Sequence, residues 1–470
     1  MRTRKTLVGP RLRQLRRQHK QTQAEMAEAL GISVSYVNLL ENNQRSLSVQ
    51  VLMNLADVYG VDWRDIIKDE ESTLLADIRS AVRDPLFDGD APDLQELRAA
   101  IDHAPKLVEQ FLQLHRSHRS ALDKLTRVGG ERMPEDLLAL SPETVIHDFF
   151  RNYSNYFHDL ERAAEGLRTE EPCDADDVYP MLKARLSRKH GIRVRTAAVE
   201  EMGDALRIYD EDEDIIHLSE ALDHQNRVFQ LAHVICLLEF GDVVEMLTAN
   251  SGLRSESSIA RCHVELANYF AAALLMPYAQ FYKVAEDTRY DVDRIAAVFA
   301  TSFEQVCQRL TALQRDGARG VPFFFLRVDK AGNVTKRFNS TSFHLAEYGG
   351  ACPVWNIHTS FRTPGVIIPQ FVELPDGARF FTISRTTERP VFSRETQDRR
   401  LALSLGCELK HAHRLAYSAS FNTEDNSLFS PIGINCHLCP RHNCSQRAHQ
   451  PMMMELPIDT NRRGNTRYES

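Results

Sequence analysis

The sequence lacks any apolar segment long enough to cross a membrane, because no hydrophobic run approaches the ~18–20 residues that a span requires. The basic N-terminus is not followed by an apolar stretch, so we expect no secretory signal peptide and a cytoplasmic protein. No internal repeat is visible, which excludes solenoid architectures. The 470 residues exceed what one core organises and favour about three domains.

An overall excess of positive charge is also missing, since the formal net charge is −8. The chain as a whole is therefore not a general polyanion binder. Its basic residues are instead concentrated at the start, where eight Arg and Lys side chains precede the first carboxylate, Glu25. A local positive field of this kind is typical of a segment that meets DNA phosphates.

Residues 22–47 predict two short helices joined by a tight turn. Apolar residues at helical spacing precede Gly31, which supplies the positive φ that the chain reversal needs. Ser33 then caps a second helix, whose short polar side chains face outward. This is the helix-turn-helix geometry for the DNA major groove, although a helical hairpin inside a larger all-α domain is the alternative.

The stretch resembles the Cro/repressor-like regulators of the xenobiotic-response-element type. In that family the position of Gln23 contacts a phosphate, and the outward residues of the second helix read base edges. The DNA-contacting residues that we expect are Arg13, Arg17, Gln23, Ser33, Ser35, Tyr36, Asn38 and Arg45. Successive half-sites lie ~34 Å apart, so we also expect a homodimer on a double-stranded DNA operator.

Pattern changes divide the chain into four segments. An all-α helix-turn-helix domain is expected over 1–70, and a helical linker with a dimer contact over 71–172. An α+β domain follows over 173–315, and a second α+β domain over 316–470. Within these two domains we expect a helix over 178–190 and strands over 192–199, 205–209, 215–218, 321–328, 366–374 and 380–384.

Residues 227–240 resemble the helix of His-Glu-x-x-His zinc peptidases, with its working side chains replaced. His233 holds the first ligand position, but Val234 and Leu237 stand where the general-base Glu and the second His belong. Residues 267–277 match a second segment of the peptidases related to the radiation-resistance regulator. Because one His cannot hold zinc, we expect a degenerate domain with no catalytic residue; an active repressor-linked metallopeptidase is the rival.

A cysteine motif stands near the C-terminus. Cys436, Cys439 and Cys444 are spaced Cys-x2-Cys-x4-Cys, so one loop can present three thiolates to zinc or to an iron–sulfur cluster. Nine cysteines in a cytoplasmic chain favour thiols or metal ligands over disulfides. A purely structural zinc site and unligated thiols are the alternatives.

Three thiolates need a fourth ligand. Cys407 is the first candidate, because it directly precedes a helix that we expect over 408–417. Cys352 is the second candidate. His437 or His442 could complete a zinc site instead.

The order of these parts resembles the short-chain fatty acyl transcriptional regulators, together with the propionate and methylcitrate-cycle regulators. The resemblance rests first on the N-terminal helix-turn-helix and on the degenerate peptidase-like segment that ends at residues 267–277. It rests also on residues 352–358, 374–377 and 436–448. It implies a regulator, not an enzyme, that senses a short-chain acyl-CoA and controls propionate or acetate assimilation. It also implies a 4Fe–4S cluster rather than zinc at the thiolates. A redox or iron sensor is the rival function.

The residues that contact the acyl-CoA are not identified by the sequence. An apolar slot could be lined by Trp355, Phe361, Val366 and Ile367, and phosphates could be met by Arg362, Arg379 and Arg385. The same residues fit an ordinary β core with a basic rim, so the ligand-binding residues are left open.

Overall fold

The computed structural model describes residues 12–13, 15–16, 19, 21–41, 45, 48–59, 70–84, 87, 91–128, 142–173, 178–253, 255–343, 350–388, 399–423, 425–452, 454–456 and 461. Arg17, expected to contact DNA, lies outside these residues. The chain forms two compact units, Met1–Leu122 and Asp123–Ser470. None of the helices that the structure describes is both long and apolar enough to span a membrane.

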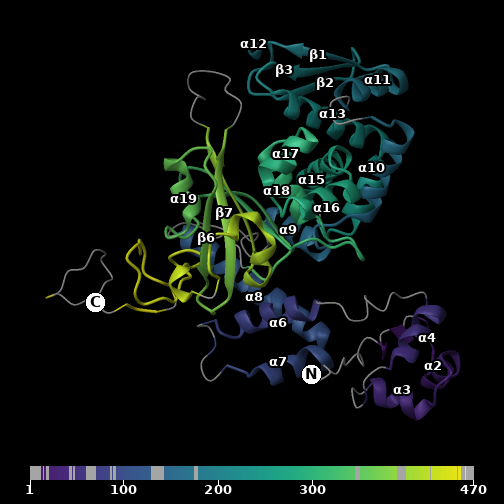
Figure 1. The fold of residues 1–470 in the computed structure, drawn as a ribbon, viewed down its shortest axis with the longest axis vertical. Coiled ribbons are helices and arrows are strands. Elements are labelled where there is room, and N and C mark those ends of the chain that lie inside the picture. Colours follow the sequence, from purple (N-terminus) through teal and green to yellow (C-terminus); the bar gives the residue numbers. More distant parts are fainter. Residues whose placement is uncertain are drawn as a thin grey trace. The chain divides into compact units, whose positions relative to one another are not determined.

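The first unit begins with three short helices around a small core (Figure 1). They are α2 (Gln23–Leu30), α3 (Val34–Glu41) and α4 (Val49–Tyr59). Thr22 caps α2, and its side chain and that of Glu25 bond reciprocally to each other's backbone N–H. The core contains Met26, Leu30, Val37, Leu40 and Leu55, so both helices of the pair bury the faces that their spacing predicts.

Three further helices of this unit form a second core: α6 (Glu70–Ala81), α7 (Leu94–His103) and α8 (Pro105–Val128). The buried carboxylate of Asp84 accepts from His115 and Arg119 on one side of α8. Two leucines of α8, Leu107 and Leu114, are 65% and 69% exposed. Seven residues separate them, so they lie on the same face of the helix.

The second unit starts with helices around a three-stranded sheet. The sheet has the order β1-β3-β2, with β1 parallel to β3 and β2 antiparallel to it. Its strands are β1 (Arg193–Ala197), β2 (Arg207–Asp210) and β3 (Ile215–Ser219). The helices are α9 (Pro142–Asn152), α10 (His158–Glu170), α11 (Val178–His190), α12 (Val199–Met202), α13 (His224–Glu239), α14 (Gly241–Ala249), α15 (Glu256–Leu275), α16 (Tyr278–Asp287), α17 (Val292–Phe299) and α18 (Phe303–Thr311).

One hydrophobic core joins α9 and α10 to α11, α13 and α15. The two first helices belong to the segment that the sequence assigns to the linker, and here they pack within the second unit. The helix expected over 178–190 and the three strands expected between 192 and 218 are confirmed.

A six-stranded sheet with the order β5-β4-β8-β7-β6-β9 completes the unit (Figure 1). Neighbouring strands are antiparallel, except that β6 and β9 are parallel. The strands are β4 (Phe324–Val328), β5 (Val334–Asn339), β6 (Ile368–Glu373), β7 (Arg379–Thr387), β8 (Leu401–Glu408) and β9 (Phe429–Pro431). The short helices are α19 (Asn356–Thr359), η3 (Ser360–Arg362), η5 (Leu409–Arg414), η6 (Ala416–Ser418) and η7 (Asn426–Leu428).

Both faces of this sheet are buried. Residues of α16, α17 and α18 cover one face, and the segment around Trp355 and α19 covers the other. The strands expected over 321–328, 366–374 and 380–384 are confirmed as β4, β6 and β7. Side chains on both faces of the sheet are buried, so successive residues of these strands are mostly apolar.

The single helix expected over 408–417 is wrong. The central strand β8 extends to Glu408, and the 3-10 turns η5 and η6 follow it. Strand β8 pairs with β4 on one side and with β7 on the other, and its pairing with β7 holds Glu408 in the strand. Gly406 is required there, because a Cβ at this position would lie 2.4 Å from Cζ of Phe324.

Candidate functional site

The turn between α2 and α3 has the geometry that the sequence predicts. Gly31 adopts φ 68°, and the side chain of Ser33 accepts from the backbone N–H of Tyr36 at 3.1 Å. From α4, Nδ2 of Asn54 donates to the carbonyl of Leu30 at 2.8 Å and so holds the end of α2. The angle between the two helices is therefore fixed by a glycine, a cap and a side-chain bond from the third helix.

The outward face of α3 carries the side chains expected to read bases. Ser33, Ser35 and Asn38 are exposed, and Arg45 lies exposed just beyond the helix. Tyr36 is half-buried, because its ring packs partly against the core of the unit. The inward residues of α3 are buried, and their packing holds the polar face of the helix toward solvent.

Glu41, which the sequence does not single out, is the electrostatic centre of this unit. Its carboxylate is buried and accepts from Arg16 at 2.6 and 3.0 Å and from Gln23 at 2.8 Å. Arg13 donates to its main-chain carbonyl at 3.1 Å. Burial alone would raise the pKa of Glu41, but the bonds from Arg16 and Gln23 outweigh it and lower the pKa. Arg13 and Gln23, both expected at DNA, are thus anchored by Glu41.

The peptidase-like helix α13 has a polar contact where a metal ligand would lie. His233 is 5% exposed, and its Nδ1 accepts from Nη1 of Arg207 on β2 at 2.9 Å. Burial and the charge of Arg207 lower the pKa of His233 to about 4, so its ring is neutral near pH 7. Val234 is buried and Leu237 is 39% exposed, and neither supplies a base or a ligand.

The structure separates Cys407 from the cysteine loop. Its thiol is fully buried on the sheet face that packs against α16–α18, and burial raises its pKa far above the ordinary range. Cys352 lies on the opposite face, in the core that includes Ile432. The preference for Cys407 as fourth ligand therefore does not fit this arrangement, because the six-stranded sheet lies between it and Cys352.

Cys352 adjoins the cysteine loop through Gly433. Burial raises the pKa of the Cys352 thiol, a bond from the Gly433 backbone lowers it, and the nearby thiols of Cys439 and Cys436 raise it further. A Cβ on Gly433 would lie 2.6 Å from Sγ of Cys439, so a side chain at this position would collide with that thiol. In the described ranges, no three His, Cys, Asp or Glu side chains are already arranged around a common metal position.

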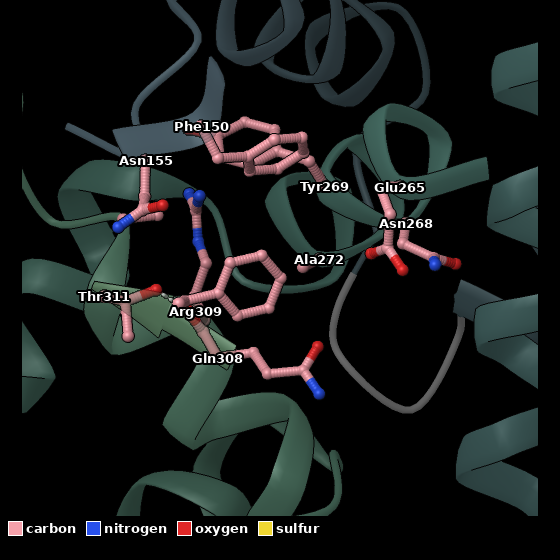
Figure 2. A pocket seen from close by; sticks show the side chains of 11 residues that line it. Phe150, Asn155, Glu265, Asn268, Tyr269, Ala272, Gln308, Arg309 and Thr311 are labelled. Carbon is pink, nitrogen blue, oxygen red and sulfur yellow. Dashed lines mark hydrogen bonds between the residues drawn. The ribbon is translucent and has the colours of Figure 1, made fainter. Parts of the chain in front are cut away.

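A small cavity lies inside the second unit, between α9, α15, α18 and β5. Its volume is about 30 Å³. Figure 2 shows Glu265 and Asn268 on one side and Arg309, Gln308 and Thr311 on the other, with Phe150 and Tyr269 near each other. Oδ1 of Asn155, which lines the cavity, is buried and has no hydrogen-bond partner among the described residues.

Charged pairs border the cavity. Arg309 is bound to Glu161 of α10, with Nη2 and Oε2 2.9 Å apart, and both side chains are 1% exposed. Tyr269 donates to the same carboxylate at 2.6 Å. Glu265 lies 3.0 Å from Nζ of Lys336 on β5. This network spans elements from both the peptidase-like helices and the six-stranded sheet.

The side chains suggested for an acyl-CoA on the sheet are engaged elsewhere. Trp355 is 3% exposed and belongs to the core. Arg379 is paired with Glu373 at 2.8 Å, and Arg385 is paired with Asp293. These residues fit the ordinary β core with a charged rim better than a ligand site.

Glu41→Gln tests the role of Glu41. We expect it to weaken the first unit by roughly 1.5–3 kcal/mol, because a charged acceptor of Arg16 becomes a neutral one. Hydrogen exchange of the backbone amides in α2 and α3, measured on the full chain near pH 7, should become about 10- to 100-fold faster. Glu28→Gln, on the exposed side of α2, is the matched control and should leave exchange unchanged.

The same variant has a signed pH dependence. The pKa of Glu41 is lower in the folded state, so its stabilisation is present above the unfolded pKa of about 4.3 and is lost as the pH falls through the folded value. Acidification should therefore destabilise α2 and α3 more in the parent than in Glu41→Gln. Equal acid sensitivity in both proteins would contradict this role.

Comparisons with known families agree with the order of these parts. Residues 12–66 match the helix-turn-helix family, and residues 187–311 match the IrrE N-terminal-like domain. Residues 312–468 match the family described as short-chain fatty acyl coenzyme A regulator, C-terminal. The three matches follow one another in the order expected, with residues 67–186 between the first and the second.

Several proteins are similar over nearly their full length. The chain is 37% identical over 464 residues to the HTH-type transcriptional regulator RamB of Mycobacterium tuberculosis, with 97% of each chain covered. It is 37% identical over 467 residues to the propionyl-CoA carboxylase regulator of Cereibacter sphaeroides, with 99% of each covered. It is 34% identical over 470 residues to the HTH-type transcriptional regulator PrpR of Mycobacterium tuberculosis, with 99% of this chain and 96% of PrpR covered.

A solved structure described as a Mycobacterium tuberculosis transcriptional regulator covers 70% of this chain and 100% of its own, with a TM-score of 0.66 and 36% identity. The likeness thus extends from sequence to fold. Together with the full-length relatives and the motifs located above, it shows that this chain belongs to the family of short-chain fatty acyl coenzyme A transcriptional regulators.

Proposed function

We propose that the chain binds operator DNA through α3 and that a short-chain acyl-CoA, bound in the second unit, changes its affinity for that DNA. The observation that carries the proposal is the exposed polar face of α3, held by Gly31, the Ser33 cap and Glu41. Short polar side chains on a fixed helix are the means by which major-groove base edges are read. The names of the relatives, among them a propionyl-CoA carboxylase regulator, support the acyl-CoA effector.

The DNA contacts that we propose divide into two kinds. Ser35, Tyr36 and Asn38 face outward from α3 and would read bases, with Ser33 at the start of the helix. Arg45 is exposed beyond the helix and would meet a phosphate, as would Arg13. Gln23 is held by Glu41 with its amide fixed, which would present it to the backbone of the DNA at little entropic cost.

We propose a homodimer that pairs through α8. The exposed leucines Leu107 and Leu114 form an apolar strip one heptad apart, and a second copy of the helix would cover it. Two copies would present two copies of α3, as a two-fold operator requires.

For the effector, the internal cavity is the site that the geometry favours. A volume of about 30 Å³ holds about two or three water-sized groups, which is room for a two- or three-carbon acyl group alone, so the CoA moiety would lie outside the cavity. Phe150, Tyr269 and Phe338 supply apolar lining.

We further propose that Cys352, Cys436, Cys439 and Cys444 hold a metal centre, a 4Fe–4S cluster or zinc. The donor set fits either group, since soft thiolates suit both. Gly433 leaves the space beside the Cys439 thiol open, which a side chain at that position would fill. A bound metal would cross-link the C-terminal loop to the segment before α19.

Asn38→Ala and Arg45→Ala test the DNA interface. On an operator selected from a random duplex library, Asn38→Ala should lose ~1–3 kcal/mol of binding, with little change on unselected DNA. Arg45→Ala should weaken binding to the selected operator and to unselected DNA alike. It should also reduce the slope of the logarithm of the binding constant against the logarithm of the salt concentration by about 0.9. Fluorescence anisotropy over a range of salt concentrations measures both effects.

Gln50→Ala, an exposed change on α4, is the control and should bind like the parent. If Asn38→Ala lost affinity equally on selected and unselected DNA, α3 would not be the reading helix.

Cys352→Ala and Cys439→Ala test the thiolate set. Each should abolish bound iron or zinc, because three thiolates hold the metal far more weakly than four. Metal and acid-labile sulfide are measured on the anaerobically purified full chain. Cys407→Ala is the matched control, since its thiol is equally buried but lies on the other sheet face, and it should retain the parent's metal content. Loss in Cys407→Ala with retention in Cys352→Ala would reverse the assignment.

A further inference from the structure

The side chain of Arg447 is buried inside the loop that carries the C-terminal cysteines. It is 5% exposed. Its terminal nitrogens donate to four main-chain carbonyls, those of Cys436, Cys439, Arg441 and His449. The bonds to the two cysteine carbonyls are 3.3 Å long. Arg447 therefore braces the same backbone that presents the thiols.

The charge of this guanidinium is not balanced by an acid. Carbonyl oxygens satisfy N–H donors, but they leave the full positive charge in place. Within the described residues, Arg447 makes no ion pair. A buried charge without a counter-charge costs free energy. Its Nε is also buried and has no hydrogen-bond partner in the same part of the chain.

Among the residues that the structure describes, two other arginines, Arg185 and Arg309, are at least as buried as Arg447, and both are paired. Arg309 binds the carboxylate of Glu161, and Arg185 binds that of Glu239 at 2.6 and 2.8 Å. Each of these two buried guanidiniums is therefore balanced by a carboxylate. Arg447 instead keeps an unbalanced positive charge and an Nε–H donor without a partner among the described residues. It lies in the loop that carries Cys436, Cys439 and Cys444.

We propose that Arg447 is the counter-charge of the metal centre held by the thiolates and that its Nε–H donates to one of the ligating sulfurs. The inference rests on the metal site proposed above. Cysteines bind metal as thiolates, so the loaded loop carries negative charge next to Arg447. Since its other donors hold main-chain carbonyls, Arg447 is a positioning residue that keeps the thiol-bearing backbone in place and lowers the energy of the anionic site.

Zinc affinity of the full chain tests this role. We expect Arg447→Met, which removes charge and donors at similar volume, to weaken Zn²⁺ binding about 10- to 100-fold in competition with a chromophoric chelator under anaerobic conditions. Arg447→Lys keeps the charge and should lose less. Arg441→Met is the matched control: its guanidinium lies in the same loop and donates to the carbonyls of Ile432 and Glu373, so it should bind zinc like the parent.

Thermal unfolding with and without Zn²⁺ separates the counter-charge from a purely structural brace. The rise in melting temperature on adding zinc should shrink in Arg447→Met and persist in Arg447→Lys and Arg441→Met. If Arg447→Met lowered the melting temperature of the metal-free chain but kept the parent's zinc affinity, Arg447 would be a brace only and the inference would fail. If the parent bound zinc no better than Cys439→Ala, the proposed metal site itself would fail with it.

Discussion

The buried ion pair between Glu161 and Arg309 is the interaction on which the second unit depends. It joins α10 to α18 across 148 residues of sequence, and both side chains are 1% exposed. Nε of Arg309 also donates to the carbonyl of Met276, at the end of α15. Removing either charge would leave the other buried and unpaired, which costs about 3–5 kcal/mol. The pair therefore sets the spacing of the helices that surround the cavity, and Arg309 itself lines that cavity. The proposed effector would contact Arg309 on α18, and the position of α18 depends on the Glu161–Arg309 pair. Binding could in this way shift α18 relative to α10.

The peptidase-like region has the helical frame of its family, with Val234 and Leu237 where the resemblance places the general-base Glu and the second His. The frame of helices is kept because its apolar residues form one core with α9 and α10. At the former metal position, Arg207 donates to His233, and a neutral imidazole in a buried site replaces a ligand. Glu265 is paired with Lys336 of β5 and faces the cavity. The region that would have held zinc now lines, in our account, the space for an effector.

Local features of the sequence predicted local structure well. Gly31, Ser33 and the apolar spacing of α2 and α3 lie within one short segment, and their geometry is as expected. The helix over 178–190 and the strands beside it follow from periodicity alone. Contacts between distant residues were not predictable in this way. Glu41 gathers Arg16 from 25 residues away, and nothing in the spacing marks it. The sequence favours Cys407 over Cys352 because a helix is expected directly after it, but the face of the sheet decides which thiol is near the loop in space.

The central claim is that an acyl-CoA bound in the second unit changes the affinity of the first for DNA. The most direct measurement is the dissociation constant for a selected operator in saturating acetyl-, propionyl- and palmitoyl-CoA and in free CoA. Coupling free energies between sites are typically ~1–3 kcal/mol, so a short-chain thioester should change the constant by about 5- to 150-fold. Free CoA, which lacks the acyl group, and the long-chain thioester, whose chain exceeds the proposed cavity, should change it much less. The same dissociation constant with and without every thioester would contradict the account.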